Sequence, residues 1–142
     1  MSDMLVLIIE PPSLSQQIRR AARVAEEGRG IQVIGVAATA PEAMALMAAA
    51  PPDVLIIDLA ENPAGGLQTL RAIRQQNNRV MILARADGAD EDFILRAIQT
   101  GVMGFITGQE DLSAALHTLR QGEPYLPPLV AGQLVRGLQR AG

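Results

Sequence analysis

Five short apolar runs, each followed by a helical stretch, constrain the fold more than any other feature of this sequence. The runs lie at residues 4–9, 31–36, 54–57, 80–84 and 102–106. Strands that are buried on both faces lose the alternation of a half-exposed strand, so continuous apolar runs of this kind favour a parallel sheet covered by helices on both sides. The sequence therefore predicts an α/β protein with a doubly wound sheet.

The segments between the runs carry helix signals. Helices are predicted at residues 13–27, 41–50, 67–76, 90–100 and 111–121, with a short sixth helix at 129–140. Ser13 and Thr39 stand at capping positions, and acidic residues in the first turn of the fourth helix suit its dipole. Gly101 and Gly122 follow the fourth and fifth helices, where glycine commonly ends a helix. Strands that alternate with helices in this way predict right-handed crossovers.

Composition narrows the function classes. The chain has 142 residues, of which 49% are hydrophobic and 19% charged, which fits one folded domain and excludes disorder. It has no Cys and no Lys, so disulfides, thiolate zinc sites and a P-loop lysine are excluded. The net charge is −3, with no arginine block of the kind that binds nucleic acid, and no apolar run is long enough to span a bilayer. We expect a cytoplasmic protein whose segment here binds neither nucleic acid nor membrane.

Two acidic residues end predicted strands, and ligands in open α/β sheets bind beyond such strand ends. Asp58 directly follows the third apolar run, and Glu10 follows the first. Asp58 is either a turn or capping residue, or a phosphoacceptor or metal-binding carboxylate. Glu10 is either solvated at its strand end or shares a divalent cation such as Mg²⁺ with Asp58, although such a site normally needs more ligands. His117 has no partner in the sequence that marks a catalytic triad, so we expect a surface or hydrogen-bonded histidine and not a catalyst.

The stretch Pro52-Asp-Val-Leu-Ile-Ile-Asp58-Leu59, together with Leu5-Val-Leu-Ile-Ile-Glu10 and Gly101-Val-Met-Gly-Phe-Ile106, resembles the response-regulator receiver domain. The resemblance implies the CheY-like, flavodoxin-like fold, with strand order 2-1-3-4-5 in the sheet, over residues 1–121. It also implies that Asp58 is the phosphoacceptor position and Phe105 the switch aromatic, although Phe105 could equally be core filling. Residues 119–128 resemble the linker of NarL/FixJ-type regulators, in which a helix-turn-helix domain would follow. We therefore expect residues 122–142 to form a linker and a short C-terminal helix.

The departures from the family pattern concern the phosphorylation site. Pro11 stands where receivers carry a second metal-binding acid. Ala84 or Ala86 stands at the Ser/Thr position after strand four, and Gly108 replaces the lysine after strand five. Phosphoryl transfer needs a metal and positive groups around the moving phosphoryl, so these losses predict a degenerate receiver. Arg85 is the nearest candidate for the missing positive charge, and we expect Asp58 to stand almost alone in a shallow acidic mouth.

The sequence therefore predicts a pseudo-receiver, not an enzyme, that signals through protein–protein contacts as the N-terminal part of a NarL/LuxR-like transcription regulator. Its partners would be a second copy and a sensor kinase or another signalling protein. Ala114, Ala115, Leu116 and Leu119 suggest an apolar fifth helix suited to a homodimer. One alternative is an interaction module of a pilus-assembly or secretion ATPase, and another is a small flavodoxin-like ligand-binding protein with Asp58 as an acid or base.

Overall fold

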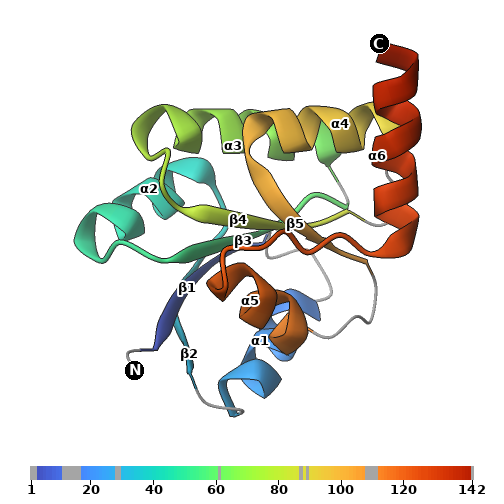
Figure 1. The fold of residues 1–142 in the computed structure, drawn as a ribbon. Helices are drawn as coiled ribbons and strands as arrows, with labels where there is room; N and C mark the ends of the chain where they lie inside the picture. The colour runs from blue at the N-terminus through green and yellow to red at the C-terminus, as the bar shows by residue number, and fades with distance from the viewer. Residues whose placement is uncertain are drawn as a thin grey trace.

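One parallel sheet organises the chain. The computed structural model describes residues 3–10, 17–27, 30–60, 62–86, 88, 90–107 and 112–141. Its strands are β1 (Met4–Ile9), β2 (Ile31–Ala37), β3 (Val54–Asp58), β4 (Met81–Arg85) and β5 (Val102–Ile106). They run parallel in the order β2-β1-β3-β4-β5 (Figure 1). This confirms the predicted fold class and strand order.

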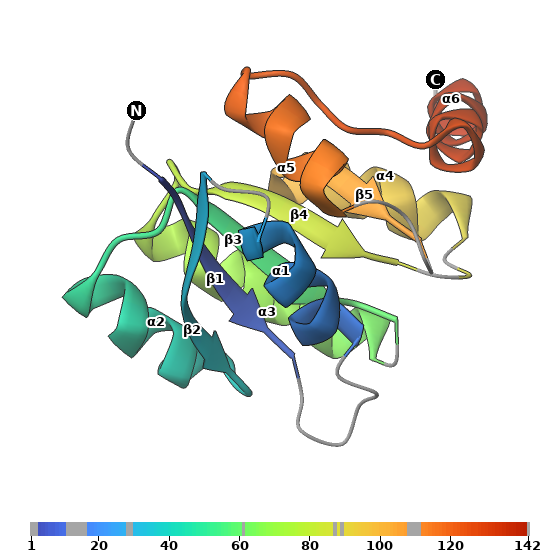
Figure 2. The same cartoon turned by 90° about the horizontal axis from the view of Figure 1, so that it is seen from below.

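Helices cover both faces of the sheet. They are α1 (Gln17–Glu27), α2 (Ala40–Ala49), α3 (Pro63–Gln76), α4 (Glu91–Thr100), α5 (Leu112–Arg120) and α6 (Pro128–Ala141). Helices α1 and α5 lie on one face and α2, α3 and α4 on the other, while α6 stands beside α4 at the β5 edge (Figures 1 and 2). Residues 13–16 and 111, which begin the helices predicted at 13–27 and 111–121, lie outside the described residues.

The apolar runs are continuous because both faces of each central strand are buried. In β1, Val6 and Ile8 pack with α1 and α5, whereas Leu7 and Ile9 pack with the helices of the other face. Every residue of β3 is buried, including Asp58. Each methylene buried in this way contributes about 0.8 kcal/mol. The two cores fix the position of the strand ends at which the candidate site residues lie.

Local capping sets the helix boundaries. Thr39 accepts a hydrogen bond from the backbone nitrogen of Glu42, and Asp90 accepts one from that of Phe93. The third helix begins at Pro63 instead of the predicted residue 67. The reason is a cap at Asn62, whose side chain accepts from the backbone nitrogen of Gly65, followed by a proline at the first helical position.

The fifth helix does not offer the broad apolar surface that the sequence suggested. Ala115, Leu116 and Leu119 are fully buried in the core shared with α1 and β1. Of the four residues that suggested an apolar helix, Ala114 alone is exposed. The helical spacing of these residues describes a core stripe, so it gives no support for a dimer through this helix.

The segment after α5 lies along the sheet instead of leaving it. Tyr125 forms a parallel bridge with Gly104 of β5. The backbone nitrogen of Phe105 donates to the carbonyl of Tyr125 at 2.9 Å, and the nitrogen of Tyr125 donates to the carbonyl of Met103 at 3.2 Å. The β5 edge is therefore paired with the chain's own linker, which places α6 against α4.

The pairing of Tyr125 with β5 leaves no room for a side chain at Gly104. A β-carbon there would lie 2.9 Å from Cδ1 of buried Leu83 and 3.2 Å from Cβ of Tyr125. We expect Gly104→Ala to lower the free energy of unfolding by about 1–3 kcal/mol through overpacking. The matched change Gly132→Ala, on α6 beside the flexible end of Arg136, should be neutral or stabilising by up to about 1 kcal/mol. Urea unfolding of both variants measures the two changes in the free energy of unfolding. Equal changes would contradict the close packing of Gly104 against Leu83 and Tyr125.

Candidate functional site: a buried carboxylate paired with arginine

The candidate site is built at the carboxyl ends of β3 and β4. Asp58 is the last residue of β3, and Arg85 is the last residue of β4. The two residues are directly opposite each other in the register of the parallel strands. The apolar residues that precede them in both strands are buried, which fixes the two backbones. The side chains of Asp58 and Arg85 therefore meet.

Arg85 and Asp58 form a buried ion pair. Nη1 of Arg85 lies 2.9 Å from Oδ2 of Asp58. The side chain of Asp58 is 0% exposed and that of Arg85 is 12% exposed. The other carboxylate oxygen, Oδ1, accepts a hydrogen bond from the backbone nitrogen of Ala60 at 2.9 Å. Both oxygens of Asp58 are therefore engaged by groups of the chain itself.

This arrangement corrects the expectation of a nearly isolated aspartate in a shallow acidic mouth. Asp58 is covered, and a guanidinium lies against it. An arginine stays protonated at all ordinary pH values, so the positive charge is permanent. The bond to Ala60 also makes Asp58 a turn residue, because a carboxylate that accepts from the nitrogen two residues ahead stabilises a turn. The turn interpretation of Asp58 describes this contact, and its role as the phosphoacceptor position stays a prediction.

Glu10 is buried at the end of β1 instead of solvated. It is 0% exposed, and its Oε2 accepts a hydrogen bond from the backbone nitrogen of Ile18 at 3.2 Å. That nitrogen belongs to the first turn of α1, where backbone donors lack partners within the helix and a negative charge is favourable. Of the two interpretations of Glu10, solvation at the strand end is wrong, because the carboxylate is buried and accepts a hydrogen bond from the start of a helix.

The described residues do not fit a Mg²⁺ site. Mg²⁺ takes six oxygen ligands in near-octahedral geometry, usually with several waters. The two candidate carboxylates, Glu10 and Asp58, are engaged by a helix nitrogen, a turn nitrogen and a guanidinium. Within the described ranges, no group of three Asp, Glu, His or Cys side chains is placed to hold a metal. The cation next to Asp58 is instead the side chain of Arg85.

The remaining predicted positions lie around this pair. Ala84 is fully buried and pairs in register with Phe105, while Ala86 is buried just past the end of β4. Phe105 is 0% exposed and packs in the core on the side of α3 and α4, as the core-filling interpretation expects. Its role as a switch aromatic stays a prediction. Gly108 and Pro11 lie outside the described residues.

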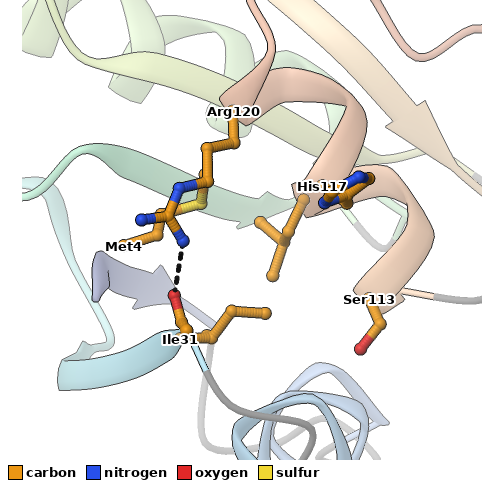
Figure 3. Close-up of a pocket in the computed structure, with 7 residues that line it drawn as sticks. Met4, Ile31, Ser113, His117 and Arg120 are labelled. Atoms are coloured by element: carbon orange, nitrogen blue, oxygen red, sulfur yellow. Dashed lines mark hydrogen bonds between the residues drawn. The ribbon is translucent and has the colours of Figure 1, made fainter. Parts of the chain in front are cut away.

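His117 lies on the surface, at the opposite end of the strands from Asp58. With Ser113 and Arg120 it lines a hollow of about 190 Å³ beside Met4 and Ile31 (Figure 3). These two residues begin β1 and β2, so the hollow lies at the opposite end of the strands from the candidate site. The imidazole Nε2 lies 3.2 Å from Nε2 of Gln121, which makes His117 a surface residue with a local partner.

Comparison with known proteins decides the family. The model of the response regulator receiver domain matches residues 6–120. The chain belongs to this receiver family. It is 26% identical over 115 residues to the response regulator GacA of Pseudomonas aeruginosa, covering 79% of this chain and 54% of GacA. It is 25% identical over 138 residues to the nitrate/nitrite response regulator protein NarL of Escherichia coli, covering 95% of this chain and 62% of NarL.

The receiver fold is also found by structural comparison. A two-component response regulator of the LuxR family from Aurantimonas sp. SI85-9A1 superposes with a TM-score of 0.81 and 26% identity, over 99% of this receiver and all of that chain. The receiver thus spans about half the length of GacA and a somewhat larger share of NarL. None of the helices within the described ranges is long and apolar enough to cross a membrane.

The buried pair predicts strong coupling between its two members. Because Arg85→Met leaves the Asp58 carboxylate buried without its counter-charge, we expect the free energy of unfolding to fall by about 2–4 kcal/mol. In the double variant with Asp58→Asn, the loss should be smaller than the sum of the two single losses by roughly 1–3 kcal/mol. Denaturant unfolding of the four proteins measures this coupling. Strictly additive losses would show that the two side chains do not stabilise each other.

Proposed function

We propose that this protein is a pseudo-receiver, whose phosphoacceptor position is held permanently by an internal cation. The observation that carries the proposal is the ion pair between Asp58 and Arg85, in which the carboxylate is 0% exposed and both of its oxygens are engaged. It would act in signal transduction without ordinary Asp–phosphate switching.

The chemistry of phosphoryl transfer supports this proposal. The attacking oxygen must be accessible to the donor, and charge on the moving phosphoryl must be neutralised by metal ions and positive groups around it. Here the positive group is bonded to one oxygen of the carboxylate that would attack. Each missing electrostatic contact commonly costs on the order of 10²-fold in rate. With Pro11 and Gly108 at the positions of the family's metal-binding acid and lysine, several such contacts are lost together.

The pair also bears on how a signal would leave the domain. In a switching receiver, phosphate shifts the population of two conformations of the output face. Ala84 and Ala86 have no hydroxyl that could follow a phosphate on Asp58. A charge that is neutralised at all times biases the domain toward one conformation. Its output would therefore depend on which proteins it contacts and not on its phosphorylation state.

The relatives suggest the context of this activity. GacA and NarL are named as response regulators, and this chain spans 54% and 62% of them. We infer that the receiver is the N-terminal regulatory part of a NarL/LuxR-like transcription regulator. Its partners are a second copy and a sensor kinase or another signalling protein. We infer that the segment itself does not bind nucleic acid, because its net charge is −3 and its arginines form no basic block.

A small-molecule enzyme with Asp58 as acid or base is less well supported. A catalytic acid or base must reach the proton that it transfers in a bound substrate. Asp58 faces Arg85 and Ala60 and has no exposed side-chain surface. The same contacts that argue against phosphorylation argue against this chemistry, so we infer that the receiver is not an enzyme.

Treatment with acetyl phosphate and excess Mg²⁺ tests the proposal. We expect no acylphosphate on the wild-type chain, measured as the mass increase of one phosphoryl group in the intact protein. The variant Asp58→Asn is the matched control, because any label that it retains lies elsewhere. Prompt, stoichiometric labelling that is lost in Asp58→Asn would contradict the pseudo-receiver.

A further inference from the structure

The two edges of the sheet differ in what lies beside them. At one edge, the linker pairs with β5 through Tyr125. At the other edge, β2 has β1 as its only neighbouring strand in the part of the chain that the structure describes, as Figure 2 shows. A strand with one neighbour presents a row of backbone groups that can pair with another chain. The contacts along β2 therefore decide whether copies of this chain can pair edge to edge.

The sequence of β2 is itself well suited to such pairing. Four of its seven residues are Val or Ile, and it carries no charge and no proline. Only its last residue, Ala37, is buried, whereas each of the other strands has at least three buried residues. Val36 is 40% exposed. Protection of this edge therefore has to come from outside the strand or from its geometry.

The backbone of Val33 faces the open edge. In a strand, the N–H and C=O groups of one residue point to the same side, and those of the next residue point to the opposite side. The carbonyl of Gly30 accepts a hydrogen bond from the nitrogen of Met4 in β1 at 2.7 Å, so Gly30 faces β1. The β1–β2 register is regular up to Val33, which is three residues further along. The N–H group of Val33 therefore points away from β1.

Glu26 binds this edge-facing donor. Its Oε2 accepts a hydrogen bond from the backbone nitrogen of Val33 at 3.2 Å. Glu26 lies in the last turn of α1 and is half-buried, whereas the neighbouring Glu27 is exposed. Charged side chains placed at an edge strand are a common protection against pairing with other chains. The fold thus gives the Val33 N–H a partner from the same chain.

An irregularity of the strand limits the edge further. Directly after Val33, the register between β1 and β2 skips Ile34. Such a bulge increases the local twist and disrupts straight pairing. The regular part of β2 is therefore short, residues 31–33, and Glu26 binds a donor within it.

We propose that Glu26 protects the β2 edge, and that its hydrogen bond to Val33 prevents β2 of a second copy from pairing there. An incoming strand has to offer a carbonyl oxygen to the Val33 N–H, which the carboxylate already occupies. The carbonyl would also come close to the negative charge of Glu26. Without Glu26, two β2 strands can pair with each other, because both are uncharged and rich in Val and Ile.

Sedimentation velocity tests the protection. At about 100 µM, we expect Glu26→Ala to have a higher weight-average mass than the wild type, because the released N–H can pair with a second copy. Glu27→Ala removes the same charge from the exposed neighbour and should sediment like the wild type. Equal masses for Glu26→Ala and Glu27→Ala would overturn the proposal. Circular dichroism checks that both variants are folded.

A third variant separates the hydrogen bond from the charge. Glu26→Gln keeps a side-chain oxygen that can accept from Val33, so it should sediment like the wild type. Association of Glu26→Gln as strong as that of Glu26→Ala would overturn the role of the hydrogen bond.

Amide hydrogen exchange tests the contact itself, at a low concentration where the variants do not pair. We expect the Val33 amide to exchange at least about tenfold faster in Glu26→Ala than in the wild type, because it loses its acceptor. The amide of Gln32 faces β1 and should exchange at the same rate in both proteins. An unchanged rate at Val33 would overturn the proposal.

These outcomes do not depend on the other proposals. A homodimer through another surface would form in the wild type and in all three variants, so the difference between the variants reports on Glu26 alone. Asp58 is unchanged in every variant.

Discussion

A single ion pair, between the last residues of two neighbouring strands, determines how this receiver should be understood. Asp58 cannot be buried as an isolated charge, because removal from water costs an ion several kcal/mol. Arg85 offsets that cost from the next strand, and Ala60 satisfies the second oxygen. The chain thus provides, as part of its fold, the neutralising charge that a metal would supply in a phosphorylated receiver.

The fold could be predicted from the sequence because burial leaves a readable pattern. Strands covered on both faces must be apolar at every position, and each run was found where a strand lies. Thr39 and Asp90 cap helices through local hydrogen bonds that sequence spacing reveals. The start of α3 was missed because the cap at Asn62 lies a full turn before the apolar stripe that marked the helix.

The site was only partly predictable, because it depends on which side chains meet across strands. The sequence identified Asp58 and offered Arg85 as a source of charge, but no local spacing fixes the register that brings them to 2.9 Å. The same limit applies to Glu10, whose partner is a backbone nitrogen eight residues away. An arginine directly before Ala86, at the end of a buried strand, was the available signal for the pair.

The C-terminal segment changes the outer surface of the domain. Tyr125 pairs with the β5 edge, and Arg136 and Arg140 hold α6 on α4 through Glu91. These contacts leave the neutral face of α6 toward solvent.

The most direct test of the central claim is a titration with beryllofluoride and Mg²⁺, followed in the NMR spectrum of the backbone amides. An Asp58 that is held by Arg85 has no site for this phosphoryl mimic, so the amides of Ala60, Arg85 and Phe105 should keep their positions at every concentration. Saturable shifts of these amides, absent in Asp58→Asn, would show that the carboxylate leaves its arginine and binds the mimic, and would contradict the account.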